Sequence, residues 1–249
     1  MSHPVVIFAD YTTQAHRANT ADQRQPVGQR MEYADGRKWR YVLIGATVIA
    51  FGNLVQGKTL VAGDYTDVLL QAAAAVGDTT VSITASGTSV ANFYAKGWMH
   101  VNKGTTLGTD SGMNYKVKSH PVFAAATKVI TLEPDDPIRV AMDTTNGEVG
   151  FTPNPYTCAI VAPITTATNV VIGVSQTRIT AAQYGFVQSG GVSCVQSAAS
   201  HVVGNRLNPI LAAAGRAGVP TASLLAEIGL VLSVPTTAGE YGSVLLTID

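Results

Sequence analysis

Charge is what this chain of 249 residues has least of. Asp, Glu, Lys and Arg make up 13% of the sequence, about half of the ~25% that is usual in soluble domains. The 16 basic and 16 acidic side chains cancel, so the chain lacks the basic excess of a nucleic-acid-binding protein. Because a net charge near zero favours association over repulsion, this composition favours a subunit that hides much of its surface in an assembly.

The chain also lacks a hydrophobic run long enough for a membrane helix. The most apolar stretch, residues 41–55, is interrupted by Gly45, Thr47 and Gly52 and is shorter than the ~20 residues that a membrane span needs. Residues 1–10 lack a basic region followed by an apolar core. We therefore expect neither a secretion signal nor a membrane partner.

Cysteine and histidine are too sparse and scattered to indicate a metal site. Cys158 and Cys194 have no metal-ligand spacing; they could form one disulfide, but free, buried thiols are favoured. His100 and His120 lie near Asp110, yet neither has a His, Cys or carboxylate two or four residues further on. A zinc site needs converging ligands, so we expect no metal and no cofactor.

Short β-rich segments between turns are what the chain does have. Residues 29–34 and 37–44 flank Asp35-Gly36, a strong hairpin signal. Between residues 66 and 160, segments rich in Val, Ile, Thr and Tyr recur every 8–15 residues, separated by turn clusters. Because no helical pattern intervenes, a parallel α/β sheet is disfavoured, and the sequence predicts an all-β fold of sandwich or barrel type.

The order of these segments predicts two β modules, one inserted in the other. Residues 37–65 and 163–249 are expected to form one module, and residues 66–162 the inserted one. Residues 1–36 are more polar and are interpreted as an extended N-terminal arm. Such an arm is either a disordered terminus or a segment that orders on a partner, and the sequence leaves both open.

The sharpest match to a catalytic motif is the string from Gly52 to Thr59, which fits the Walker A pattern G-x-x-x-x-G-K-[ST]. In such a loop Lys58 would contact the β- and γ-phosphates of a nucleotide, and Thr59 would contact Mg²⁺. The motif needs a helix directly after the lysine, and residues 60–65 are poor helix formers. We therefore interpret the string as a hairpin turn with an exposed lysine.

No other arrangement indicates catalysis. Ser193 lies in Gly191-Val-Ser-Cys-Val, which lacks the second glycine of a nucleophile elbow. Asp135-Asp136, between two prolines, is more typical of a solvated turn than of a calcium site. No carboxylate pair indicates a glycosidase. We therefore expect no enzyme activity and assign no catalytic residue.

The aromatic residues are scattered rather than interleaved with a basic run, so a stacking platform for single-stranded nucleic acid is not indicated. Trp98 is interpreted as a core or sheet-packing residue. Trp39 is flanked by Lys38 and Arg40 and lies near Arg37. Because Trp and Arg dominate interface energetics, Trp39 is either an interface residue or a local packing residue.

Two stretches of the chain resemble the capsid decoration (cement) proteins of tailed bacteriophages. Residues 34–57, from Ala-Asp-Gly-Arg-Lys-Trp-Arg-Tyr to Gly-Asn-Leu-Val-Gln-Gly, are similar to the opening hairpin of such proteins. The second stretch runs from Tyr184-Gly-Phe-Val through Ile228-Gly to Gly239-Glu-Tyr-Gly-Ser-Val. The middle of the chain, with Tyr94-Ala-Lys-Gly-Trp, looks like the β-rich insertion that accompanies them.

This resemblance implies a structural virion protein, made in the host cytoplasm and located on the outer capsid surface. It implies a homotrimer that clamps adjacent major capsid protein subunits and stabilises the expanded head, because a ligand that binds only the expanded lattice stabilises that lattice. The family's N-terminal arm reaches over the coat protein. The matching part of this chain is residues 1–36, with Arg17, Arg24 and Arg30 as candidate contacts to the capsid or to other subunits. Arg37 and Trp39 are further interface candidates because of their residue types.

Two alternatives belong to other functional classes. The chain could be a phage tail or receptor-binding component that recognises host glycans, which predicts a cleft lined by aromatic residues and carboxylates. It could also be an enzyme, either a P-loop nucleotide binder or a depolymerase.

Overall fold

The computed structural model describes residues 6–10, 15–64, 67–85, 87–104, 111–124, 126–163, 168–198, 201–209, 213–219, 227–233, 235 and 237–249. Over these residues the chain forms seventeen β-strands and one short 3-10 turn, η1 (Ala15–Arg17). The predicted all-β fold with two β modules is confirmed. Within the described ranges, no helix is long and apolar enough to cross a membrane.

The chain divides into two compact units. Residues 1–58 and 155–249 form the discontinuous unit, and residues 59–154 form the inserted unit. Both junctions lie a few residues earlier than the predicted 65/66 and 162/163. The reason is local packing: Asp64 is already buried against side chains of the inserted unit, while residues 160–161 pair with a strand of the discontinuous unit.

The inserted unit is a six-stranded antiparallel sheet with the order β5-β10-β7-β8-β9-β6. A bridge between Leu70, just after β5, and Ile83 of β6 joins its two edge strands and nearly closes it into a barrel. Closure leaves fewer unpaired backbone groups at the sheet edges. The strands are β5 (Val68–Leu69), β6 (Thr80–Ala85), β7 (Trp98–Lys103), β8 (Asn114–Ser119), β9 (Ala126–Leu132) and β10 (Glu148–Thr152).

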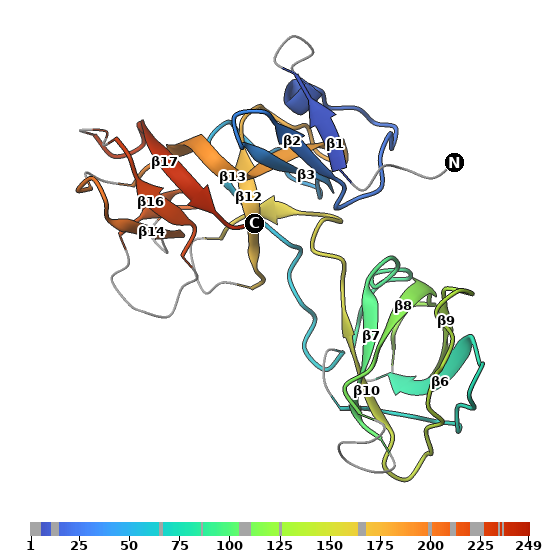
Figure 1. Ribbon diagram of the computed structural model, residues 1–249. Helices are drawn as coiled ribbons and strands as arrows, with labels where there is room; N and C mark the ends of the chain where they lie inside the picture. Colours follow the sequence, from blue (N-terminus) through green and yellow to red (C-terminus); the bar gives the residue numbers. More distant parts are fainter. Residues whose placement is uncertain are drawn as a thin grey trace. The chain divides into compact units, whose positions relative to one another are not determined.

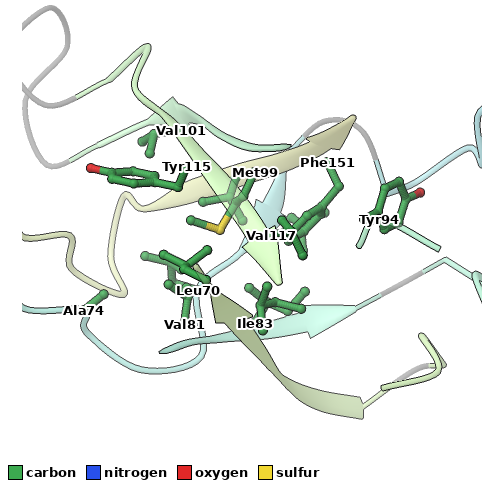
Figure 2. Close-up of a cluster of buried hydrophobic side chains, with 14 of the residues drawn as sticks. Leu70, Ala74, Val81, Ile83, Tyr94, Met99, Val101, Tyr115, Val117 and Phe151 are labelled. Atoms are coloured by element: carbon green, nitrogen blue, oxygen red, sulfur yellow. The ribbon is translucent and has the colours of Figure 1, made fainter. Parts of the chain in front are cut away.

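Period-two alternation gives this barrel one interior. On β7, Met99 and Val101 point inward and are buried, and on β8 Tyr115 and Val117 do the same. Figure 2 shows these side chains converging with those of β6 and β10. The side chains form a single hydrophobic cluster.

The discontinuous unit is built on an eleven-stranded sheet. Figure 1 colours the first of its strands blue and the later ones yellow to red. The strands are β1 (Val6–Ala9), β2 (Arg30–Tyr33), β3 (Lys38–Leu43), β4 (Leu54–Gln56), β11 (Ile160–Val161), β12 (Val171–Ser175), β13 (Tyr184–Gln196), β14 (Arg206–Pro209), β15 (Ala217–Gly218), β16 (Gly229–Val231) and β17 (Tyr241–Thr247).

β13 connects the two halves of this sheet. Its first half pairs with β3 and its second half with β17, and the register shifts between Gln188 and Gly190. Gly191 adopts a φ of 79°, and a Cβ there would lie 3.0 Å from the Cα of Arg37. Glycine is therefore needed at this point, where the strand changes partner beside another backbone.

The described part of residues 1–36 lies against this sheet. β1 pairs in parallel with β2, and β2 pairs antiparallel with β3. Thr20 exchanges two backbone hydrogen bonds with Tyr184 of β13, at 2.8 and 3.0 Å. The segment that was predicted as an arm thus contributes Met31 and Tyr33 to a largely aromatic cluster with Trp39, Tyr41 and Phe186, and its residues Ile7, Ala9 and Ala15 pack against that cluster.

Candidate interaction surface

The clearest exposed apolar surface is formed by β13, β16 and β17 of the discontinuous unit. Val192 lies directly opposite Leu245, and Leu245 lies opposite Leu230. Val192 is 51% exposed and Leu245 is 37% exposed. We call this row of Val192, Leu230 and Leu245, together with Tyr241 on the same side of β17, the apolar face.

Alternation along the strands explains why the face exists. Val195, Val244, Leu246 and Val231 point to the opposite side of the same strands and are buried in a hydrophobic cluster. The residues between them are therefore left on the outer side. Apolar side chains also occupy some of these outer positions, so the strands are apolar on both sides where Val192, Leu230 and Leu245 lie. Single exposed apolar residues are ordinary, but a row across three strands is typical of an interaction site.

The apolar face is uncharged, and charges occur at its edge. Between Val192 and Tyr241 the two strands present Cys194, Gln196 and Ser243 on the outer side. The row ends at Arg206 of β14, which lies opposite Leu230 and forms an exposed ion pair with Glu227 at 3.2 Å. An apolar centre with a polar rim is the usual arrangement of a protein interface.

Tyr241 extends the face with an aromatic ring. It is 47% exposed and contacts Phe51 edge to face, with 5.3 Å between the ring centroids. Gly52 has a φ of 72°, and a Cβ on it would lie 2.5 Å from the ring of Tyr241. The first glycine of the Walker-like string therefore makes room for this ring.

The five predicted contact residues do not gather on the apolar face. Arg17 and Arg24 are exposed in and after η1. Arg30 pairs with its neighbour Glu32 at 2.9 Å. Arg37 pairs with Asp35 at 2.6 Å and lies over the ring of Tyr33. These arginines all belong to the segment before and within the first hairpin.

Trp39 requires a correction. It is completely buried, and its ring lies 4.6 Å from that of His16 and 6.2 Å from that of Tyr33. Of the two interpretations, the structure supports packing, and no surface of Trp39 remains for a partner. The flanking charges pointed to an interface, but η1 covers this side of β3. Burial is also the main reason why the pKa of His16 is lowered, with Arg37 and Arg17 adding to it.

Sequence reasoning missed an ion pair that joins β3 to the end of the sequence. Arg40 donates two hydrogen bonds to the carboxylate of Asp249, both at 2.7 Å, and Ser189 donates a third at 3.3 Å. The hydrogen bond from Arg40 lowers the pKa of Asp249, and the same bond raises the pKa of Arg40. Nothing in the local sequence links two residues so far apart.

The Walker-like string forms β4 and the turn before it, and no helix follows Lys58. The backbone carbonyl of Lys58 accepts a hydrogen bond from Asn169 at 2.6 Å. The string is thus part of the sheet rather than a phosphate loop. The expected exposure of the lysine is wrong: Lys58 is 8% exposed, and this burial lowers its pKa.

One serine and one histidine do come together. The Oγ of Ser197 lies 2.5 Å from the Nε2 of His201. Burial lowers the pKa of His201, and a hydrogen bond with the backbone of Ala217 opposes this. A nucleophile beside a base is a catalytic pattern, but Ser197 is 4% exposed and the cavity beside it is about 10 Å³. That volume holds about one water molecule, so no substrate has room there.

The inserted unit contains a buried polar cluster around Asp64, which is fully buried. Its carboxylate accepts hydrogen bonds from Ser89 and, at 2.9 Å, from the hydroxyl of Tyr94. Burial raises the pKa of Tyr94, and the carboxylate of Asp64 adds to the rise. His120 accepts a hydrogen bond from the backbone N–H of Tyr94 at 2.9 Å. These bonds fix the chain where it enters the barrel.

The other sequence candidates have structural roles in the described parts of the chain. His100 is half-buried in β7, and Asp110 lies outside the described residues. Asp136 accepts a hydrogen bond from the backbone of Lys116 at 2.7 Å and pairs with Arg139, as a turn residue does. Searched over the described residues, the chain has no group of three His, Cys, Asp or Glu side chains that could hold a metal.

Both cysteines are free, as favoured, and Cys194 is half-buried on the outer side of β13, between Val192 and Gln196. Cys158 is exposed rather than buried. It lies in the turn before β11 with a φ of 51°. No disulfide therefore constrains the sheet.

Comparisons of the chain with protein-family models, with curated proteins and with solved structures found no match.

Proposed function

We propose that this protein is a structural subunit that binds the outer surface of a phage capsid and cements adjacent major capsid protein subunits. The observation that carries the proposal is the apolar face of β13, β16 and β17. The row is uncharged, with Val192 and Leu245 exposed and Leu230 half-buried. In a chain with half the usual charge, such a row supports a surface that is covered by protein.

The energy of covering this face is sufficient for an assembly built from many copies. Fully burying a Val or Leu side chain is worth about 1.5–3 kcal/mol, so burying the exposed part of each of these residues contributes roughly 0.5–1.5 kcal/mol. One copy thus gains a modest binding free energy. A lattice with many equivalent sites multiplies that gain, and a ligand that binds only the expanded lattice stabilises the expanded lattice by mass action.

The proposal includes self-association into a homotrimer on the capsid surface. With a mass of 25.9 kDa per chain, the trimer has a mass of about 78 kDa. The role proposed is structural, with no enzyme activity. The resemblance of residues 34–57 and of the last third of the chain to decoration proteins supports this role and the virion location.

The experiment has two steps. Light scattering measures the mass of the purified protein, and the protein is then mixed with expanded capsids that lack it. We expect a trimer that sediments with the capsids and raises their melting temperature. A monomer that neither sediments with capsids nor changes their melting would contradict the proposal, and binding to a glycan array would then favour the receptor-binding alternative.

Two matched variants locate the surface. Val192→Glu places a charge in the apolar face, where Val192 is 51% exposed, and Val129→Glu places one on β9 of the inserted unit, where Val129 is 49% exposed. We expect Val192→Glu to abolish capsid binding or trimer formation and Val129→Glu to leave both unchanged. Equal effects of the two charges would show that the apolar face is not the contact.

A further inference from the structure

The lysine of the Walker-like string lies across the sheet from one of the two cysteines. β4 and β11 pair antiparallel, with Gln56 directly opposite Ile160. Followed two residues further along both chains, the same register places Lys58 opposite Cys158. Side chains that lie opposite each other in an antiparallel pair share one face of the sheet, with Cβ atoms about 4.5–5.5 Å apart. The register thus brings an amine and a thiol together.

Two further observations keep these residues close where the strand pairing ends. A Cβ on Gly57 would lie 3.2 Å from the Cα of Pro155, so the chain that leaves β4 runs along the turn before β11. The negative charge of the Cys158 thiolate also acts on the ammonium of Lys58, because it opposes the lowering of the pKa of Lys58 by burial. Such an interaction weakens with distance, so the ends of the two side chains lie near each other.

The two side chains differ in their exposure to solvent. Lys58 is 8% exposed, and its backbone carbonyl accepts a hydrogen bond from Asn169 at 2.6 Å. Burial disfavours the charged form of an amine, which increases the share of the neutral, nucleophilic form of Lys58. Cys158 is exposed, so a dissolved oxidant can reach its thiol. A nucleophilic amine therefore lies beside a thiol that can be oxidised.

We propose that hydrogen peroxide joins Cys158 to Lys58 through a covalent S–N bond. In the first step the thiolate of Cys158 attacks one peroxide oxygen. An S–O bond forms, the O–O bond breaks, and the hydroxide that leaves takes up the thiol proton as water, which gives a sulfenic acid. In the second step the neutral amine of Lys58 attacks the sulfur. The S–N bond forms, the S–O bond breaks, and the hydroxide leaves as water with one proton from the nitrogen. The protein loses two hydrogen atoms, and one peroxide becomes two waters.

This bond would join the two chain crossings at the base of the insertion. Lys58 is the last residue of the discontinuous unit before the inserted unit, and Pro155 is the first residue after it. A bond from Lys58 to Cys158 would close a covalent ring that contains the whole inserted unit. A cross-link around so long a loop constrains the unfolded chain and stabilises the folded one. The bond would therefore act as an oxidative staple of the discontinuous unit.

The experiment uses the full chain with Cys194→Ser. Cys158 is then the only cysteine, so no disulfide can form within one chain. The protein is treated with hydrogen peroxide, and its intact mass is measured without reducing agent. We expect a monomer about 2 Da lighter, a digest in which one cross-linked peptide pair contains Lys58 and Cys158, and recovery of the original mass with dithiothreitol. The stapled protein should melt several degrees higher than the untreated protein.

Two lysine variants in the same background identify the nucleophile. Lys58→Arg keeps the positive charge, but a guanidinium is not deprotonated in proteins. This variant should form no lighter species. Its sulfenic acid should persist long enough to be trapped by dimedone, or should oxidise further to products about 16–32 Da heavier. Lys118→Arg, at an exposed position of β8, is the matched control and should form the staple as the parent protein does.

Three results would overturn the proposal: only heavier oxidation products in the parent protein, an equal yield of the lighter species in Lys58→Arg, or an unchanged melting temperature of the stapled protein. A melting curve of each untreated variant checks that it folds. If Lys58→Arg does not fold, the digest of the parent protein decides, because the cross-linked peptides name the two joined residues directly.

Discussion

The inserted unit and the discontinuous unit use the same kind of strand in different ways. In the inserted unit a nearly closed sheet directs one side of every strand to a single core. In the discontinuous unit an open sheet is packed by three separate hydrophobic clusters. Exposed apolar residues occur in both units, but Val129 of the inserted unit lies opposite Ser82, whereas Val192 lies opposite Leu245.

This difference indicates where a partner can bind. In a nearly closed sheet most strands pair on both edges, and the exposed Val129 of the inserted unit lies opposite a polar residue, Ser82. An open sheet with apolar residues on both sides is stabilised when other segments pack on both sides. In the discontinuous unit, no described segment packs on the outer side of β13, β16 and β17 where Val192 and Leu245 are exposed. The N-terminal segment covers the other end of the same sheet, over β3. The candidate sites therefore belong to the discontinuous unit, and four predictions examine this contrast.

The largest effect is expected from Trp39→Ala. The fully buried ring fills the aromatic cluster beneath η1, and removing a buried aromatic side chain costs about 3–5 kcal/mol of unfolding free energy. Chemical denaturation measures the loss of unfolding free energy, and native-state hydrogen exchange shows where it occurs. We expect lower amide protection in the discontinuous unit and unchanged protection in the barrel strands of the inserted unit. A loss below about 1 kcal/mol would contradict the assignment of Trp39 to the core.

Tyr94→Phe examines the inserted unit in the same way. It removes the hydroxyl that donates to the buried carboxylate of Asp64, and a buried polar group that loses its partner costs about 1–3 kcal/mol. Tyr184→Phe is the control, because the Tyr184 hydroxyl makes only a long contact of 3.5 Å with Gln23. We expect the control to lose less than about 0.5 kcal/mol by urea denaturation; equal losses would argue against a structural role for the Asp64 cluster.

A smaller, pH-dependent effect is expected from the pair of Arg40 and Asp249. Because the folded-state pKa of Asp249 is lowered, its stabilisation is fully present above the ordinary carboxyl pKa. That stabilisation is lost as the pH falls through the lower folded-state value. Asp249 is partly exposed, with 27% of its side chain accessible, so the contribution is about 1 kcal/mol or less. Unfolding measured at pH 7 and at pH 2 should therefore differ less for Asp249→Asn than for the unmodified protein, and an identical difference would contradict this role.

The smallest effect on stability is expected from Val192→Glu and Val129→Glu. Both side chains are half-exposed, so each change should alter the unfolding free energy by about 0.5 kcal/mol or less. The two variants should differ in assembly, as measured by light scattering, rather than in thermal melting. A large loss of stability in Val192→Glu alone would mean that the face belongs to the core of the subunit rather than to its surface.

Much of the fold could be predicted from local patterns. The Asp35-Gly36 turn and the alternation from Lys38 to Leu43 predict the first hairpin, and β2 and β3 form it. The alternation also places Trp39 and Tyr41 on one side of β3. It does not say whether that side is covered, so the sequence left Trp39 as either an interface residue or a packing residue. Whether Trp39 is buried depends on η1, because His16 of η1 packs against the ring of Trp39. No pattern in the local sequence around β3 indicates this contact.

The candidate sites could be predicted less well. β17 has apolar residues on both sides, with Val244 and Leu246 buried and Leu245 outside, but only its neighbours β13 and β16 decide which side remains open. Ser197 and His201 carry no motif, and the approach of Lys58 to Cys158 depends on the pairing of β4 with β11. Such sites consist of residues that are distant in sequence, and local periodicity contains no information about them.

The sequence by itself determined many of the strands and turns and the presence of an insertion, because these depend on period-two alternation and on residues that favour turns. The tertiary structure alone decided that Leu70 pairs with Ile83 and nearly closes one sheet, that Lys58 and Trp39 are buried, and that Val192, Leu230 and Leu245 lie in one row on the outer side of the other sheet. Each of these outcomes depends on which distant segments cover a strand, and burial is a property of those long-range contacts rather than of the strand itself.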